Sequence, residues 1–286
     1  MEFGPFRVST HVHGSFRLDG GAMFGTVPKA LWSRLIPVDS DNRIEMVTRS
    51  LILEAGGRTL MADAGNGDKG SAKFKEMFEI RNAAGPAYAA APAPTAGGFD
   101  PARVTDLVLT HLHFDHAGGA SRWAPAGPPE VELCYPEAAH YVQAANFENA
   151  KAPNIREKAS YLKENVLPLE RGRLRLTEGS EEILPGVWVH RSDGHTRGLQ
   201  WVEVRNGSES IAFPSDLIPT SRHIPLAYTM GYDICAEALL AEKEDLLRRA
   251  AAGRWIVVFI HDPDIPAARI ALDANGRFSI SEIVHL

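Results

Sequence analysis

The stretch T-H-L-H-F-D-H, residues 110–116, constrains this chain more than any other part of its sequence. Histidine and aspartate are poor core residues, so packing does not account for three histidines and an aspartate in six positions. His111 and His113 are two residues apart, and at the end of a strand such positions face the same side. Asp115 and His116 are adjacent, so the chain must turn if both serve one site. We therefore expect two neighbouring sites, one with each pair of side chains.

Imidazole and carboxylate groups together favour a metal of borderline character, most suitably zinc, with manganese, iron or cobalt as alternatives. A catalytic site uses about three protein ligands per metal, so four ligands are too few for two ions. Three further side chains lie at the ends of predicted strands, where a loop presents them from a rigid base: His195 in D-G-H-T-R-G, Asp216 after I-A-F-P-S and His261 after W-I-V-V-F-I. Any single histidine of this kind more often makes an ordinary hydrogen bond. The cluster and its followers together predict two divalent metal ions.

Composition sets broad limits on the partners of this chain. Its 286 residues carry a net charge of −6, which argues against a nucleic-acid partner, because phosphate binding needs a basic surface. No run approaches the 18 or so apolar residues of a membrane span, and the N-terminus lacks the pattern of a signal peptide. Cys134 and Cys235 are expected to be reduced thiols in or near the core. These features favour a cytoplasmic protein that does not act at a membrane.

Hydrophobic periodicity predicts alternating strands and helices in both halves of the chain. Strands are expected within 6–18, 45–65, 106–110, 183–216, 254–263 and 268–286, with a hairpin at Ala55-Gly56-Gly57. Helices are expected within 70–80, 136–150, 154–166 and 236–253, the last with a stripe of Leu239, Leu240, Leu246 and Leu247 and a stop at Gly253. No linker divides the chain. The pattern predicts an α/β sandwich with sheets inside and helices outside.

Two segments depart from this regular pattern. Residues 18–37 are rich in glycine and proline yet carry Met23, Phe24 and Trp32, so we expect an apolar loop that packs on the body or lines a pocket. Residues 83–99 are rich in alanine, proline and glycine, and we expect a flexible surface segment there.

The motif T-H-L-H-F-D-H-A-G-G, followed by G-H-T, by an aspartate after a strand and by a late strand-end histidine, resembles the metallo-β-lactamase superfamily. The resemblance covers nearly the full chain. It implies a four-layer αβ/βα sandwich and a single domain over residues 1–286. It also implies that Asp63, in M-A-D-A-G, is a carboxylate that supports the metal ligands, although an ordinary turn carboxylate is an equal alternative.

The resemblance implies how the ligands divide between the two metals. His111, His113 and His195 would hold the first ion, Asp115, His116 and His261 the second, and Asp216 would bridge them. Two divalent ions lower the pKa of bound water and polarise a substrate oxygen. A metal-bridging hydroxide would be the nucleophile, with Asp115 as the catalytic proton acceptor or relay.

The segment L-D-G-G-A-M-F-G-T-V-P-K-A-L-W, with S-D-L-I-P-T, P-N-I-R and Y-L-K-E-N, is similar to a branch containing quorum-quenching N-acyl-homoserine lactone lactonases and methyl-parathion-type hydrolases. This implies lactone opening, with Met23 and Phe24 touching an acyl chain or ester group and phosphotriesterase side activity. The alternatives are an organophosphate or aryl ester hydrolase on the same metals, then a β-lactamase-like hydrolase or thioesterase. A non-catalytic metal-binding scaffold is the alternative from another class, and it need not hold two metals.

One position departs from the lactonase pattern. Some lactonases place a tyrosine three residues after the bridging aspartate, where this chain has Pro219. His223, Tyr228 or Tyr232 is each a candidate substitute from the same loop, with a surface role as the alternative for each. Lactonases of this kind are often homodimers, and the apolar segment would serve an interface as readily as a pocket.

Overall fold

A computed structural model describes residues 1–82 and 100–286 of the chain. The segment expected to be flexible, 83–99, lies outside the described residues. The chain divides into two compact units. The first unit comprises residues 1–15 and 48–178, and the second comprises residues 16–47 and 179–286. The expectation of a single domain stays a prediction.

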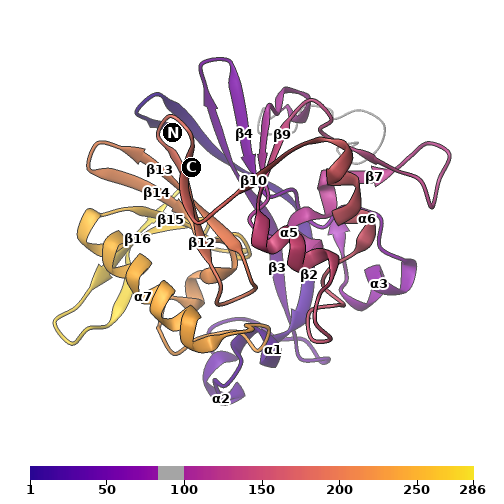
Figure 1. Cartoon of the computed structure of the whole chain (residues 1–286). Coiled ribbons are helices and arrows are strands. Elements are labelled where there is room, and N and C mark those ends of the chain that lie inside the picture. The colour runs from indigo at the N-terminus through magenta and orange to yellow at the C-terminus, as the bar shows by residue number, and fades with distance from the viewer. Residues whose placement is uncertain (83–99) are drawn as a thin grey trace. The chain divides into compact units, whose positions relative to one another are not determined.

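The first sheet has the strand order β1-β2-β3-β4-β6-β9-β10, with β5 paired to β2 (Figure 1). These strands have the following bounds: β1 Glu2–Phe3, β2 Phe6–Asp19, β3 Arg43–Ala55, β4 Arg58–Ala62, β5 Arg81–Asn82, β6 Asp106–Val108, β9 Ala139–Gln143 and β10 Arg173–Thr177. The predicted hairpin joins β3 to β4, and Gly56 and Gly57 both take positive φ angles in its turn. From β4 onward the pairs β4–β6, β6–β9 and β9–β10 are parallel.

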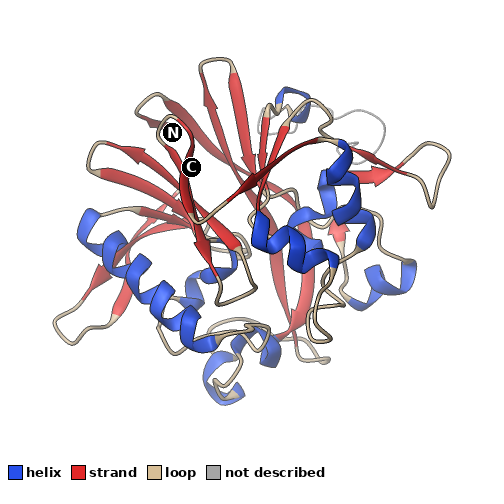
Figure 2. Ribbon diagram, viewed as in Figure 1, coloured by secondary structure: helices blue, strands red, loops and turns tan. Residues whose placement is uncertain are grey.

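The second sheet keeps the chain order from β11 to β17. Figure 2 draws the strands of the protein in red and its helices in blue. Its strands have the following bounds: β11 Ser180–Leu184, β12 Val187–Ser192, β13 Leu199–Asn206, β14 Glu209–Phe213, β15 Ile256–Val258, β16 Ala267–Leu272 and β17 Phe278–Val284. A separate hairpin pairs β7 Ser121–Trp123 with β8 Val131–Leu133. The strands predicted between residues 183 and 286 are therefore confirmed.

The α-helices have the following bounds: α1 Gly20–Phe24, α2 Lys29–Trp32, α3 Ala72–Met77, α4 Phe114–Ala117, α5 Ala144–Lys151, α6 Lys163–Val166 and α7 Ala236–Gly253. The short 3₁₀ helices are η2 Pro101–Arg103, η3 Gly118–Ala120, η4 Leu167–Arg171, η5 Ser215–Leu217 and η6 Ser221–His223. Within the described residues, no helix combines the length and the apolar character that a membrane crossing requires.

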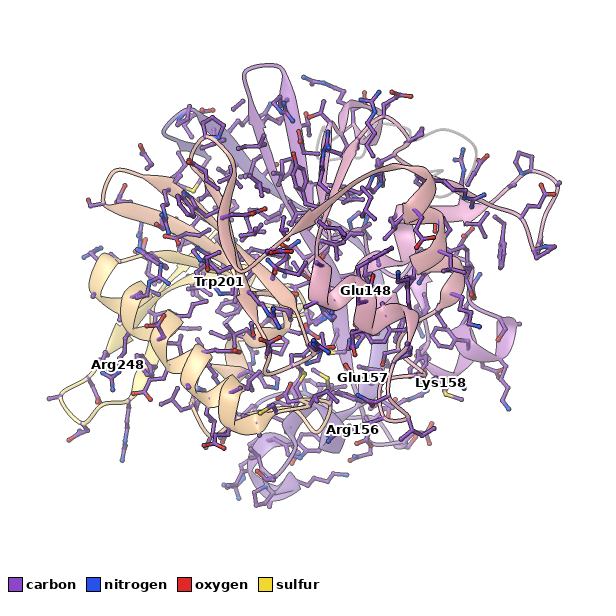
Figure 3. The ribbon with its side chains drawn as sticks, viewed as in Figure 1. Glu148, Arg156, Glu157, Lys158, Trp201 and Arg248 are labelled. Atoms are coloured by element: carbon purple, nitrogen blue, oxygen red, sulfur yellow. The ribbon has the colours of Figure 1, made fainter. Side chains whose placement is uncertain are left out.

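Helix α7 packs on the second sheet through a leucine face. Leu239, Leu246 and Leu247 are buried in one cluster with Trp201 of β13, which Figure 3 labels, whereas Leu240 is 39% exposed. The prediction of Leu240 in the buried stripe is wrong, because its position on the helix turns it to solvent. The helix spans Ala236–Gly253, the bounds predicted from the sequence, and Arg254 after it adopts a left-handed conformation.

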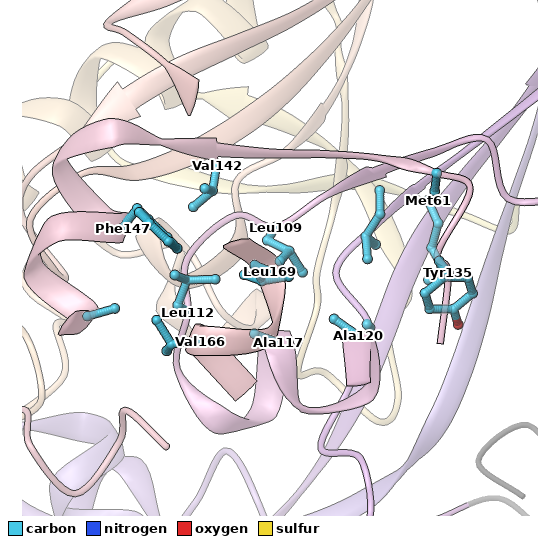
Figure 4. Packing of buried hydrophobic residues seen from close by; sticks show 14 of the residues in the cluster. Met61, Leu109, Leu112, Ala117, Ala120, Tyr135, Val142, Phe147, Val166 and Leu169 are labelled. Carbon is cyan, nitrogen blue, oxygen red and sulfur yellow. The ribbon is translucent and has the colours of Figure 1, made fainter. Parts of the chain in front are cut away.

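The core of the first unit surrounds the loop that carries the histidine motif. Leu109, Leu112 and Ala117 of that region pack with Val142 of β9 and Phe147 of α5 (Figure 4). Apolar side chains alternate with the histidines, so burial of one set fixes the direction of the other. The core therefore positions the motif.

Three predictions of local structure are wrong. Residues 139–143 form strand β9 instead of a helix, because their backbone pairs with both β6 and β10. Residues 155–160 form turns, and only α6 is helical in the predicted 154–166 segment. The expected loop 18–37 contains α1 and α2. The thiols of Cys134 and Cys235 are free as expected, but Cys235 is exposed.

Candidate metal centre

The motif begins in the loop after β6 and ends in the short helix α4. Nε2 of His111 and Nδ1 of His113 lie 3.0 Å apart, as the two-residue spacing predicts. His113 precedes α4 in an extended conformation, and the helix begins at Phe114. The predicted turn therefore occurs before Asp115 and His116. It brings Nε2 of His116 within 3.6 Å of Oδ2 of Asp115.

Asp63 organises this half of the site from the end of β4. Its Oδ1 accepts a hydrogen bond from the Thr110 backbone N–H at 2.7 Å, and its Oδ2 accepts one from Thr110 Oγ1 at 2.8 Å. Oδ2 also lies 2.9 Å from Nδ1 of His116. Asp63 adopts a positive φ of 63°, which is uncommon for a residue with a side chain. The interpretation of Asp63 as a support of the metal ligands thus has a geometric basis.

The hydrogen-bond partners of Asp63 fix which nitrogen of each ring carries the proton. An ionised carboxylate only accepts, so His116 donates from Nδ1 and presents a lone pair at Nε2. Thr110 Oγ1 has one proton, which it donates to Asp63, so at 3.2 Å it accepts from Nδ1 of His111. His111 likewise presents Nε2. Both rings therefore have Nε2 available to bind a metal ion.

A buried lysine holds the chain that follows the motif. Lys69 Nζ donates to the carbonyl oxygens of Gly118 and Ser121, and its burial lowers its pKa to about 8. Gly67 packs so closely on Gly118 that a Cβ atom on Gly67 would lie 2.3 Å from the Gly118 carbonyl oxygen. The loop of residues 65–69 therefore holds the C-terminal end of the motif in place through hydrogen bonds and close packing.

The opposite side of the motif contacts residues 146–161. The backbone N–H of Leu112 donates to Asn146 Oδ1 at 2.9 Å, and Asn146 Nδ2 lies 3.2 Å from the Tyr161 hydroxyl. The Tyr161 ring meets the His113 ring edge to face, with centroids 4.6 Å apart. These contacts fix the backbone between the two leading histidines and the orientation of the second.

The second unit places Asp216 between two imidazoles. Asp216 lies in η5, directly after strand β14, and is 6% exposed. Its Oδ2 is 3.3 Å from Nε2 of His195, and its Oδ1 is 3.1 Å from Nε2 of His261. The structure thus brings together the three ligands that sequence reasoning predicted in this unit.

Both predicted ligand histidines of this unit, His195 and His261, use Nδ1 for a protein contact. Nδ1 of His195 lies 2.9 Å from Oδ1 of Asp233, and Nδ1 of His261 donates to the Val47 carbonyl at 2.8 Å. A neutral ring that donates from Nδ1 carries a lone pair on Nε2. Each lone pair then faces an oxygen of Asp216, which also only accepts. Two acceptors that face each other repel. A cation bound by both the ring nitrogen and the carboxylate oxygen would remove this repulsion.

The donor chemistry of the two units fits divalent metal ions. The first unit offers three imidazoles and the Asp115 carboxylate, and the second offers two imidazoles and the Asp216 carboxylate. All seven groups are at most 7% exposed. Imidazole nitrogen and carboxylate oxygen are the ligands that zinc and similar ions take in catalytic sites.

The predicted substrate-pocket residues lie together in the second unit. Phe24 stacks on His223 with ring centroids 4.8 Å apart and on Trp32 at 5.4 Å. His223 Nε2 lies 2.8 Å from the Met23 carbonyl oxygen, and its Nδ1 lies 2.8 Å from Thr220 Oγ1. Burial lowers the pKa of His223 to about 4. The contacts of these side chains support packing, and contact with a substrate stays a prediction for Met23, Phe24 and His223.

Sequence reasoning missed the residues that support the ligands in the second unit. Asp233 is buried in the loop before α7, and a single aspartate in a loop carries no motif. Lys69 of the first unit was missed for the same reason. Only the fold brings either side chain to the site.

Residues 44–261 match the sequence profile of the Metallo-beta-lactamase superfamily, and they make up well over half of the chain. The chain belongs to the metallo-beta-lactamase superfamily. The expected metallo-beta-lactamase fold, an α/β sandwich of mixed sheets with helices, is confirmed. Membership of this superfamily implies a dinuclear centre of divalent metals, which the histidine and aspartate groups fit.

Proteins similar to this chain include several lactonases. N-acyl homoserine lactonase AttM of Rhizobium johnstonii is 35% identical over 183 residues, which are 58% of this chain and 61% of that protein. An N-acyl homoserine lactonase of a Bacillus species is 33% identical over 103 residues, which are 36% of this chain and 34% of that protein. The chain thus spans about a third to three fifths of the length of these curated relatives. It is a member of the superfamily that is similar in sequence to N-acyl homoserine lactonases.

Solved structures extend the similarity to the whole chain. A probable metal-dependent hydrolase from Staphylococcus aureus has a TM-score of 0.86 and 26% identity, with 99% of this chain and 100% of that chain covered. AidC, a dizinc quorum-quenching lactonase, has a TM-score of 0.73 and 16% identity, with 100% and 97% covered. The second likeness concerns the fold alone.

Proposed function

We propose that this protein is a dinuclear metal hydrolase that opens the ring of N-acyl homoserine lactones. The observation that carries the metal assignment is the position of Asp216, whose two oxygens each face an imidazole Nε2 within 3.3 Å. A carboxylate in that position has one oxygen for each of two ions. We assign zinc as the metal, because five imidazoles and two carboxylates suit it.

The ligands divide between the ions as the family resemblance implies. His111, His113 and His195 hold the first ion, and Asp115, His116 and His261 hold the second, with Asp216 shared. Within the first unit, the 3.0 Å separation of the facing nitrogens of His111 and His113 supports a common ion for these two rings. The 3.6 Å separation of Asp115 and His116 supports the same for the second pair. On this proposal both units contribute to one metallo-beta-lactamase-like domain.

When bound, two such metals supply a nucleophile from water at neutral pH and polarise the carbonyl oxygen of the substrate. The residues of this chain orient the reacting groups. Asp63 and Thr110 hold Nδ1 of His116 and of His111, so that both rings keep Nε2 directed at the site. Asp115 takes up the proton that water releases and delivers it to the leaving alkoxide of the opened ring. Because Asp115 is only 7% exposed, bulk water does not compete strongly for this proton.

The substrate assignment rests on the relatives. Curated proteins similar to this chain are N-acyl homoserine lactonases, and the sequence carries several stretches of that branch outside the metal motif. Degradation of a lactone signal, known as quorum quenching, would be the biological consequence. Cytoplasmic location and a homodimer stay predictions.

Ring opening of a panel of acyl-homoserine lactones from short to long chains tests the proposal. The zinc-loaded protein is assayed beside Asp115→Asn, with methyl paraoxon and a chromogenic β-lactam as comparison substrates. We expect lactone turnover that exceeds the other two reactions and falls at least 100-fold in Asp115→Asn, because proton transfer contributes about that factor. Faster cleavage of methyl paraoxon than of every lactone would instead support an organophosphate or aryl ester hydrolase, and would contradict the substrate assignment.

A further inference from the structure

The loop that carries His195 is fixed to the start of helix α7. The Glu242 carboxylate in α7 accepts hydrogen bonds from Ser192 Oγ at 2.5 Å and from the backbone N–H groups of Asp193 and Gly194 at 2.9 and 3.2 Å. One helical side chain therefore satisfies three donors, one at the end of β12 and two in the loop that follows it. A partly buried carboxylate with several donors restrains the groups that it binds.

The backbone adds a second attachment. The N–H of Ile234 donates to the His195 carbonyl at 3.1 Å, and the N–H of Cys235 donates to the Gly194 carbonyl at 2.9 Å. A Cβ atom on Gly194 would lie 2.4 Å from Cα of Leu239, so only glycine permits this approach. The residues just before α7 and the loop that carries His195 therefore form one rigid assembly.

Asp233 is the side chain of this assembly that reaches the imidazole. It is 4% exposed, and its two oxygens have different partners. Oδ1 lies 2.9 Å from Nδ1 of His195, and Oδ2 accepts from the Met230 backbone N–H at 2.7 Å. The Met230 contact fixes the rotation of the carboxylate. Since an ionised carboxylate has no proton to donate, Nδ1 of His195 must carry the hydrogen.

We propose that Asp233 is a positioning residue that holds His195 in the Nδ1–H tautomer and thereby sets the affinity of the protein for its metal. This inference rests on the proposed function in one respect, the assignment of His195 as a ligand. With the proton on Nδ1, the lone pair is on Nε2, the atom that faces Asp216 at 3.3 Å. A carboxylate behind a ligating histidine also raises the basicity of the ring, and its removal typically weakens metal binding 10- to 100-fold.

Asp233→Asn tests the proposal with almost no change of shape. His195 and Met230 face different oxygens of Asp233, and an asparagine amide has only one oxygen, so one of the two donors would face an NH₂ group. The matched control is Asp193→Asn, two residues from His195 in the same loop. The Asp193 carboxylate accepts from Gly198 and pairs with Arg191, and neither contact involves the imidazole.

Two readouts that do not depend on turnover decide the outcome. In nitrogen-15 NMR spectra of the metal-free wild-type protein, His195 is expected as the Nδ1–H tautomer. Zinc competition with a chromophoric chelator is expected to give affinity about 10- to 100-fold weaker in Asp233→Asn and unchanged in Asp193→Asn. Far-UV circular dichroism of both variants monitors folding. If Asp233→Asn does not fold, the wild-type tautomer decides the proposal by itself.

Two results would overturn the inference. One is a wild-type His195 with its proton on Nε2, and the other is a folded Asp233→Asn variant that binds zinc as tightly as Asp193→Asn. Neither readout uses a lactone, so failure of the lactonase assignment leaves this test intact. Conversely, if the protein opens lactones but His195 carries its proton on Nε2, the role of Asp233 is refuted and the proposed function stands.

Discussion

Asp63 and His116 lie 53 positions apart in the chain, yet Oδ2 of Asp63 and Nδ1 of His116 are only 2.9 Å apart. The same carboxylate accepts two hydrogen bonds from Thr110. In Asp63→Asn, an NH₂ group replaces one oxygen, so a donor faces a donor at one of these contacts. We expect zinc affinity to fall about 10- to 100-fold, measured by chelator competition. Asp41→Asn, at an exposed position, is the control, and equal zinc affinity in both variants would contradict this role for Asp63.

We expect the buried His223 to make the free energy of unfolding depend on pH. Burial lowers its pKa from 6.5 to about 4, opposed by its hydrogen bond with the Met23 carbonyl and reinforced by Lys243. Because the unfolded chain takes up the proton near pH 6.5 and the folded chain only near pH 4, stability falls as the pH drops through this window. Chemical denaturation of the wild type at several pH values measures the slope. His223→Gln has no titrating group at this position, so an equally steep slope in that variant would refute the assignment.

We expect the buried Glu203 to cause a second decrease of the free energy of unfolding, at lower pH. Burial alone would raise its pKa, but hydrogen bonds from His190, Arg205 and Ser210 outweigh burial and lower it to about 2. The stabilisation by this carboxylate is complete above about pH 4.5 and is lost as the pH falls toward 2. Glu203→Gln should lower the free energy of unfolding at pH 7 by about 2 kcal/mol, because Arg205 and Arg249 lose the buried carboxylate that they contact.

Exposed ion pairs provide the comparison for Glu203. Glu244 pairs with Arg248 on the outer side of α7, and Glu244→Gln should change the free energy of unfolding by at most about 0.5 kcal/mol. Urea denaturation of both variants measures the difference. Equal effects of the two substitutions would contradict the special role of the buried carboxylate.

Lys69 supports the motif from the loop after β4. Lys69→Met keeps the length of the side chain but leaves the carbonyl groups of Gly118 and Ser121 without this donor. We expect a loss of about 2 kcal/mol in the free energy of unfolding, the cost of buried acceptors without a hydrogen bond. Lys73→Met, on an exposed side chain of α3, should be close to neutral. Urea denaturation measures the free energy of unfolding of both variants. An equal decrease in the two would show that the contacts of Lys69 with the carbonyl groups do not stabilise the fold.

Much of the fold follows from local signals in the sequence. The double glycine at 56–57 marks the β3–β4 hairpin, and the leucine spacing and length of 236–253 mark α7. These elements were predictable because their signals act over a few residues. Strand β9 was not, since residues 139–143 become a strand by pairing with β6 and β10, whose positions the local sequence does not encode.

The residues of the site also differ in how far the sequence predicts them. His111, His113, Asp115 and His116 were predictable as a group because short spacing places them on one loop. Asp233 was not, because its contact with His195 joins residues 38 positions apart and depends on how α7 meets the loop between β12 and β13. Asp63, which orients His116, lies in a stretch that resembles the family, whereas the position of Asp233 is defined by tertiary structure alone.

Metal content tests the central claim most directly. The purified protein is loaded with zinc, dialysed and measured by inductively coupled plasma mass spectrometry, beside His111→Ala treated in the same way. Our account predicts about two zinc ions per chain in the wild type and clearly fewer in the variant. A wild-type protein without zinc, or a variant that retains the full amount, would contradict the assignment of these residues to a dinuclear hydrolase centre.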